Sequence, residues 1–262
     1  YMLYRLYVQL FDLEQRWNLL IIVIMIISMM IGAFGGLAEN SIRRVLGYQM
    51  LNGMPFILVM LAFTSDDPRR ALAAGIMYTI HHMVTVGSLI LASGAIEETY
   101  GTGVLSKLSG LARRDPIIAW IFAAGAFSVV GFPPFSGMWG KLMIVFEIAR
   151  VGGAWAWIAI AAIIIASFAA FLAMLRVWRK VFWGKGLPED KVPDELVIRK
   201  KLMAPSAALI LGSLCMFIFS GIVLDVVDSA AEQLLDTNAY TETVLGDEPI
   251  AVPNIDEIQE GR

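Results

Sequence analysis

Six long apolar segments constrain the fold of this 262-residue chain more than any other feature. Windows of about 19 residues place them at 17–38, 45–64, 72–96, 116–150, 154–178 and 203–227. At about 1.5 Å per residue, each can cross a hydrocarbon core of roughly 30 Å as a helix. Hydrophobic residues make up 58% of the chain and charged residues 16%. The sequence therefore predicts an all-α integral membrane protein, a polytopic helical bundle.

The fourth segment, 116–150, is too long for one straight crossing and contains helix-breaking residues at its centre. The run Gly-Phe-Pro-Pro-Phe-Ser-Gly places Pro133 and Pro134 between Gly131 and Gly137. Proline removes a backbone donor and glycine permits bends, so we predict one broken helix. Broken helices persist at membrane depth where protein buries them or where they line a wet cavity, and transporters use them at ion sites.

Basic residues predict the orientation of the chain. When loops are assigned alternately to two sides, one side receives most basic residues, namely Arg43, Arg44, Lys107, Arg113, Arg114 and those of the connection at 179–202. The positive-inside rule makes that side cytoplasmic. The acidic tail at 228–262 is then expected outside the cytoplasm, while residues 1–16 resemble the end of a preceding membrane helix and its loop.

Three basic residues lie deep in the apolar segments. His81 and His82 occupy the middle of the third segment, where adjacent side chains point about 100° apart on a helix. Imidazole can both donate and accept a proton near neutral pH, so we interpret the pair as a proton relay; hydrogen bonding for helix packing is the alternative. Lys141 follows the helix break and has no acidic residue within five positions on either side. A functional role is favoured, since a buried lysine releases its proton more readily than an exposed one.

Four further polar residues are candidates for a path or gate: Tyr48, Asn52, Ser136 and Glu147. Tyr48 and Asn52 lie early in the second segment, where either a hydrated path or hydrogen bonds across helices would suit them. Ser136 belongs to the helix break itself. Glu147 lies near the outer end of the broken helix, where a solvated helix end is the default interpretation and an exit gate the alternative.

Several classes of site have no support in the sequence. Cys215 is the single cysteine, so a disulfide or a thiol redox pair within this chain is excluded. The sequence contains no Gly-rich phosphate loop and no metal-ligand spacing, so we expect no cofactor and no metal. The basic run at 199–201 abuts the sixth apolar segment, where topology or anionic lipid headgroups explain it better than nucleic acid does. The lipid bilayer is the expected surrounding.

Five stretches, taken together with their order and spacing, resemble a known family: 40–48, the double histidine, 93–102, 108–116 and 131–141. They look like the antiporter-like subunits shared by respiratory complex I and Mrp-type monovalent cation/proton antiporters. The stretch at 231–245 is most similar to the ending of the D-type subunits of the Mrp antiporters.

The resemblance implies a fold with inverted five-helix repeats. This chain would hold the second repeat at 17–178, with its broken helix at 116–150, and the last helix at 203–227. Lys141 and His82 match a lysine and a histidine on the family's proton path. Val86 stands where the family often has a lysine, and residues 49–52 depart from a Ser-x-x-Ser-Gln run of the family.

The resemblance also implies a function: a secondary ion transporter subunit, not an enzyme, in which proton movement drives export of Na+ or another monovalent cation. The implied partners are other small hydrophobic subunits, and the implied location is a bacterial or archaeal cell membrane. Two alternatives remain, a proton-pumping subunit of an NADH:quinone oxidoreductase-type complex and a non-conducting membrane scaffold. The Mrp-like tail favours the antiporter, and titratable residues within the bilayer argue against the scaffold.

Overall fold

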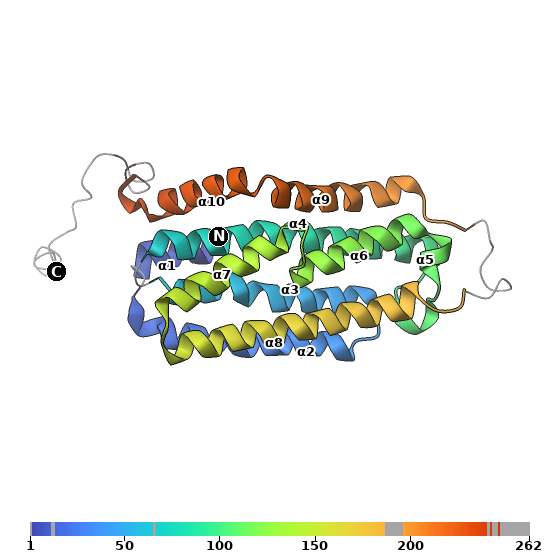
Figure 1. Ribbon diagram of the computed structural model, residues 1–262, viewed down its shortest axis with the longest axis horizontal. Coiled ribbons are helices and arrows are strands. Elements are labelled where there is room, and N and C mark those ends of the chain that lie inside the picture. Colours follow the sequence, from blue (N-terminus) through green and yellow to red (C-terminus); the bar gives the residue numbers. More distant parts are fainter. Residues whose placement is uncertain are drawn as a thin grey trace, which may run out of the picture.

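The computed structural model describes residues 2–11, 14–64, 67–186 and 196–239, together with Glu242 and Gly246. These residues form an elongated bundle of helices that run side by side (Figure 1). Five stretches are long and apolar enough to cross a membrane: Gln15–Ala38, Ile42–Ala62, Pro68–Tyr100, Gly153–Phe182 and Lys200–Ile218. The prediction of an all-α membrane bundle is thus confirmed.

The helices follow the predicted segments closely. The first apolar segments become α2 (Asn18–Ala38), α3 (Ile42–Leu58) with its 3-10 extension η2 (Val59–Ala62), and α4 (Pro68–Tyr100). The fifth becomes α8 (Gly153–Val177), which continues as a π-helical turn, η4 (Trp178–Phe182). Shorter elements are α1 (Met2–Phe11), η1 (Gln15–Trp17), η3 (Leu105–Lys107) and α5 (Leu111–Arg114).

Helix α4 is the structural centre of the bundle. It begins with Pro68 in its first turn, where proline costs no hydrogen bond, and it ends at Gly101, whose φ of 69° favours glycine. Helices α3, α6, α7, α9 and α10 all pack against it. Because neighbours pack on several sides of α4, both histidines are removed from lipid and from bulk water, whereas Met83 beside them is 67% exposed.

The predicted helix break is present. Helix α6 (Pro116–Val130) ends at Gly131, whose φ is 101°, and α7 (Gly137–Val151) begins six residues later (Figure 1). Each half has 15 residues, or roughly 22 Å at 1.5 Å per residue, which is too short to cross the hydrocarbon core alone. The break therefore lies at the depth of the membrane interior.

The described loops that carry most of the basic residues come together at one end of the bundle. Backbone hydrogen bonds join Ile42 to Gly103 at 2.9 Å and Gly110 to Trp183 at 3.2 Å. The backbone amide of Ile198 donates to Asp115 Oδ1 at 3.0 Å. This end carries α5 and the start of α9 in Figure 1. Its assignment to the cytoplasm stays a prediction, and residues 187–195 of the predicted connection lie outside the described residues.

The last apolar segment differs from the prediction of one helix at 203–227 followed by a tail at 228–262. Helix α9 (Lys200–Ile218) ends before Phe219, and a separate helix, α10 (Ser220–Leu235), follows. The boundary at 227 was wrong because an apolar face continues past it: Val227, Ala231 and Leu234 are buried at helical spacing. Acidic residues on the other face obscured this period. Of the predicted tail, residues 240, 241, 243–245 and 247–262 lie outside the described residues.

Candidate functional site

The two histidines are buried in the middle of α4 and point in different directions. His81 is 0% exposed and His82 is 2% exposed. Tyr78, one turn earlier, contacts both: its ring lies edge-on to His81 with centroids 5.4 Å apart and nearly parallel to His82 with centroids 5.8 Å apart. Tyr78 therefore packs against both imidazoles from the preceding turn of α4.

His81 faces the break in the α6–α7 helix. Its Nδ1 lies 2.8 Å from Ser136 Oγ. A Cβ at Gly137 would come within 3.0 Å of its Nε2 and within 2.0 Å of the carbonyl oxygen of Ser128. Gly137 is thus required where α4, α6 and α7 meet, because only a residue without a side chain permits this approach.

His82 faces α3. A Cβ at Gly53 would lie only 1.9 Å from its Cε1, so the imidazole packs directly on the α3 backbone. Neither ring nitrogen of His82 has a hydrogen-bond partner of ordinary geometry among the described residues. The backbone of Met50 also interacts with this imidazole. The adjacent histidines therefore differ: His81 bonds to Ser136 at the helix break, whereas His82 lies against the α3 backbone without a hydrogen bond of ordinary geometry.

Lys141 sits on the first turns of α7 and reaches back across the break. Its Nζ donates to the carbonyl oxygen of Val130 at 2.7 Å and to Ser167 Oγ at 3.0 Å. The Val130 carbonyl is available because the last four carbonyls of a helix lack partners within the helix. The ammonium also benefits from the negative end of the α6 dipole. No carboxylate in the described part of the chain forms an ion pair with Lys141.

A layer of stacked rings lies between Lys141 and His82. The Lys141 ammonium lies 5.4 Å from the centroid of the Phe56 ring. Phe56 stacks on Tyr78 with centroids 5.2 Å apart, and Tyr78 stacks on His82. The structure places Lys141 and His82 around the same aromatic stack without a direct hydrogen bond between them. A proton passing from one to the other needs an intervening carrier.

Unsatisfied polar atoms indicate where such a carrier fits. Five buried side-chain atoms on α3 and α4 have no hydrogen-bond partner of ordinary geometry in the described residues: Gln49 Nε2, Asn52 Oδ1, His81 Nε2 and both ring nitrogens of His82. Buried polar groups are nearly always paired, with ordered water where protein atoms do not serve. All five belong to α3 and α4, which pack against each other. Internal water beside these atoms would satisfy them.

The other predicted residues divide into two groups. Ser136 lies beside His81, as described above. Asn52 precedes Gly53, on which His82 packs, and the backbone of Asn52 lies against Gly32 of α2. Tyr48 instead packs on α2, where a Cβ at Gly35 would come within 2.3 Å of its ring, so its contacts are those of helix packing. Glu147 lies near the opposite end of α7 from the break and approaches Arg150 at 3.7 Å. The structure does not bring Tyr48 or Glu147 to the histidines.

Sequence reasoning missed three hydroxyl groups at the break. Thr85, Ser128 and Ser213 are 0% exposed and bond to one another or to Ser136. Single serines and threonines are common in membrane helices, so the presence of these three residues did not indicate a site. The spacing of Ser206 and Ser213, seven residues apart on α9, is the one pattern that could have marked a buried polar face.

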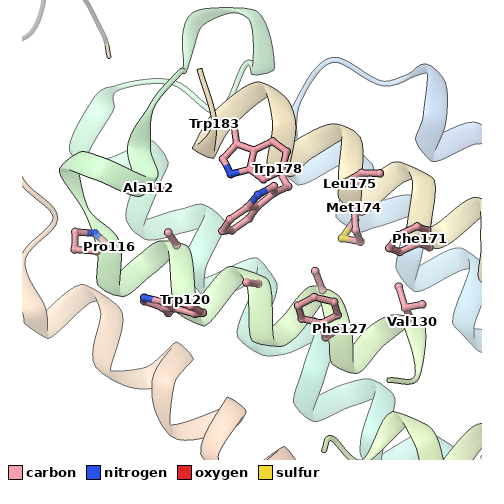
Figure 2. Close-up of a pocket in the computed structure, with 13 residues that line it drawn as sticks. Ala112, Pro116, Trp120, Phe127, Val130, Phe171, Met174, Leu175, Trp178 and Trp183 are labelled. Atoms are coloured by element: carbon pink, nitrogen blue, oxygen red, sulfur yellow. The ribbon is translucent and has the colours of Figure 1, made fainter. Parts of the chain in front are cut away.

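One apolar groove is separate from these polar groups. It has a volume of about 480 Å³ and lies between α6 and α8, where Trp120 and Phe127 face Phe171 and Trp178 (Figure 2). Apolar and aromatic side chains line it, and Val130 lies at one end. No titratable side chain lines it, so it is not the ion site. In the described part of the chain, no three His, Cys, Asp or Glu residues are grouped as metal ligands.

Comparison with known proteins agrees with the resemblance seen in the motifs. The D subunit of the Na+/H+ antiporter of Bacillus subtilis is 31% identical over 220 residues, which cover 84% of this chain and 43% of that protein. The N subunit of the NADH-quinone oxidoreductase of Cupriavidus taiwanensis is 24% identical over 208 residues, 77% of this chain and 42% of that protein. The chain thus spans less than half the length of these curated relatives.

Solved structures show the same fold. A chain in the structure of the Mrp complex from Dietzia sp. DQ12-45-1b superposes with a TM-score of 0.84 and is 30% identical, covering 94% of this chain and 52% of that chain. A chain of respiratory complex I from Thermus thermophilus superposes with a TM-score of 0.66 at 20% identity. The family model described as NADH:quinone oxidoreductase/Mrp antiporter, TM, matches residues 1–171. This chain therefore belongs to the NADH:quinone oxidoreductase/Mrp antiporter transmembrane family.

Proposed function

We propose that this chain is a membrane subunit of a multi-subunit monovalent cation/proton antiporter, and that protons move through it by way of Lys141, His82 and His81. It is a secondary transporter rather than an enzyme. Its partners are other small hydrophobic subunits, and its location is the cell membrane of a bacterium or archaeon. The observation that carries the proposal is Lys141 at the helix break, held by neutral groups alone.

Neutral partners suit a lysine that must gain and lose a proton. The carbonyl of Val130, the hydroxyl of Ser167 and the ring of Phe56 each favour the ammonium over the amine. None of them carries a full negative charge, so release of the proton does not leave an unpaired carboxylate in the membrane interior. Lys141 can therefore alternate between charged and neutral forms at lower cost than a lysine in a buried ion pair.

The path between Lys141 and the histidines runs through water in this proposal. Unpaired atoms on Asn52, Gln49 and His82 would hold a short water chain beside the aromatic stack. Imidazole takes a proton on one nitrogen and releases it from the other, which suits His82 to this chain. Val86 stands at a position where the family resemblance implies a lysine. In this chain His82 and water alone would therefore carry protons between Lys141 and the histidines. His82→Ala is expected to slow exchange and to change its dependence on pH.

The test of the function uses the purified complex that contains this chain, reconstituted into vesicles. An imposed proton gradient should drive Na+ or another monovalent cation across the membrane, and an imposed cation gradient should move protons the other way. The proposal would be contradicted if neither gradient drove movement of the other ion. A dye inside the vesicles reports pH, and radioactive Na+ or its congeners report the cation.

The second candidate is a proton-pumping subunit of an NADH:quinone oxidoreductase-type complex. Relatives named as the N subunit of NADH-quinone oxidoreductase support it at 24% and 29% identity. The two candidates differ in their partner proteins, because an oxidoreductase needs electron carriers and an antiporter does not. Flavin or iron-sulfur proteins in the purified complex would favour this second candidate. Small hydrophobic subunits alone would favour the antiporter.

A further inference from the structure

We propose that Ser213, on helix α9, is a positioning residue that allows His81 to change its protonation state. This inference rests on the proposed function and adds a helix outside the predicted five-helix repeat to the site. Its basis is a chain of hydrogen bonds that runs from the imidazole of His81 through the helix break to α9 and back to α4. The chain joins four helical segments through side chains with no exposed surface.

The chain contains four hydroxyl groups and four short contacts. His81 Nδ1 lies 2.8 Å from Ser136 Oγ, and Ser136 Oγ lies 2.8 Å from Ser213 Oγ. Ser213 Oγ lies 2.9 Å from Ser128 Oγ, which lies 2.8 Å from Thr85 Oγ1. Thr85 also approaches His81 Nδ1, at a longer 3.3 Å. Each hydroxyl has one hydrogen, so four hydrogens suffice for the four short contacts.

The protonation state of His81 decides the direction of this chain. When Nδ1 carries no hydrogen it accepts from Ser136, which accepts from Ser213, and the remaining hydroxyls follow in the same direction. When the imidazole gains a proton at Nδ1, that nitrogen becomes a donor, and Ser136 must accept from it. The hydrogen of Ser136 then needs another acceptor, and the reversed chain runs through Ser213 and Ser128 to Thr85, whose own hydrogen turns away from Nδ1. No covalent bond to a hydroxyl hydrogen breaks in this change; the hydroxyls rotate.

Ser213 supplies that acceptor. In the described part of the chain, the Ser136 hydroxyl makes its hydrogen bonds to His81 and Ser213. Without Ser213, the Ser136 hydrogen that turns away from Nδ1 has no hydroxyl to receive it in a site that excludes bulk water. An unsatisfied buried group of this kind disfavours the charged imidazole. Ser213 therefore acts on proton uptake through Ser136 and not by contact with the proton's path.

The surroundings of His81 allow an effect of Ser213 to be recognised. The other titratable groups that face it are Tyr78 and His82 on α4 and Lys141 on α7. Helix α6 contains no titratable residue, and those of α9, namely Lys200, Lys201 and Cys215, are exposed. Changing Ser213 leaves all these groups in place. A change in the pH dependence of exchange can then be assigned to the hydroxyl chain.

The protein offers a matched control on the same pair of helices. Ser206, seven residues before Ser213 on α9, is also fully buried and lies 3.0 Å from Ser88 Oγ on α4. Each of these two hydroxyls lies 2.8 Å from the other residue's backbone carbonyl oxygen. Ser206→Ala thus removes a hydrogen bond between α9 and α4 without touching the chain that ends at His81.

The experiment measures proton exchange against pH for the purified complex in vesicles, with Ser213→Ala and Ser206→Ala compared with the unchanged protein. In Ser213→Ala the alkaline limb, where His81 ceases to take up its proton, should move toward lower pH by about one unit, a tenfold change in proton affinity. Ser206→Ala should leave the position of that limb unchanged. Loss of assembled protein would lower the amplitude of both curves but would not move either along the pH axis.

A second pair of variants separates the hydroxyl from side-chain size. Ser213→Thr keeps the hydroxyl and Ser213→Val replaces it with a methyl group of similar volume. The inference predicts that the Thr variant keeps the original pH profile and the Val variant shifts like Ala. The inference is overturned if the alkaline limb has the same position in Ser213→Ala and Ser206→Ala. It is also overturned if this limb moves equally far in Ser213→Thr and Ser213→Val. Should Lys141→Ala retain full exchange, the proposed function fails instead, whatever the serine variants do.

Discussion

The Nζ of Lys141 donates a 2.7 Å hydrogen bond to the carbonyl oxygen of Val130, across the interruption between α6 and α7. The break frees the carbonyl group of Val130 at membrane depth, and the side chain of Lys141, eleven residues later, binds that carbonyl. Gly131 is part of this arrangement, since a Cβ there would lie 3.0 Å from Lys141 Cδ. The lysine and the break form one structural unit.

Ser167 on α8 is the other hydrogen-bond acceptor of the Lys141 ammonium, and its removal should be detectable. Ser167→Ala weakens the charged form of the lysine by one hydrogen bond, worth about 0.5–1.5 kcal/mol. The limb of the exchange curve at which Lys141 loses its proton, which lies at higher pH than the limb of His81, should therefore move toward lower pH by up to about one unit. Exchange measured from about pH 5 to about pH 10 in vesicles checks this. An unmoved limb would show that Ser167 does not support the ammonium.

Gly53 keeps α3 in contact with His82, and a methyl group there should displace the imidazole. Gly53→Ala would place its Cβ 1.9 Å from His82 Cε1, an overlap that costs about 1–3 kcal/mol to relieve. We expect slower proton exchange at unchanged amounts of assembled complex. Gly47→Ala on the same helix is the control, because no atom lies within 4 Å of its added Cβ. Equal rates in the two variants would contradict the placement of His82.

Leu234 tests whether α10 is a packed helix rather than part of a solvated tail. This side chain is 1% exposed, so Leu234→Ala should reduce stability by about 2–5 kcal/mol. Ile222→Ala, on the same helix but 66% exposed, should have little effect. Thermal unfolding of the purified complex in detergent measures both. The packed helix would be refuted if the two variants unfolded at the same temperature.

We predict that the end of the bundle where the basic residues gather faces the cytoplasm and that the acidic tail lies on the opposite side of the membrane. In a Cys215→Ser background, Asp247→Cys in the acidic tail should react with a membrane-impermeant thiol reagent in intact cells. Lys185→Cys at the basic end should react only after lysis. The opposite pattern of labelling would mean that the chain is inserted the other way round.

Local chemistry explains which parts of the fold the sequence could predict. Two consecutive prolines, Pro133 and Pro134, between two glycines cannot continue a helical hydrogen-bond ladder, so the break needed no knowledge of tertiary structure. Lys141 and the histidines were conspicuous because ionisable groups are costly in lipid. The role of Ser213 was invisible, because its partner Ser136 is 77 positions away in sequence and a serine in a membrane helix is unremarkable.

The predicted end of the last helix, at residue 227, was wrong for a different reason. Mean hydropathy weighs a residue by type and ignores the face of the helix on which it lies. Asp228 made the sequence beyond 227 look like tail, although it flanks the buried face and pairs with Arg69 of α4 at 3.4 Å. A helical period through Val227, Ala231 and Leu234 was present and would have extended the helix.

The most direct measurement of the central claim is proton exchange by Lys141→Ala, with Lys107→Ala at the surface as the control for loss of a lysine. The account predicts that Lys141→Ala assembles normally and loses cation-dependent proton exchange. Lys141→Arg should fail too, because guanidinium does not release its proton, while Lys107→Ala should exchange normally. Wild-type exchange by an assembled Lys141→Ala complex across the whole pH range would contradict the account and make Lys141 a structural residue.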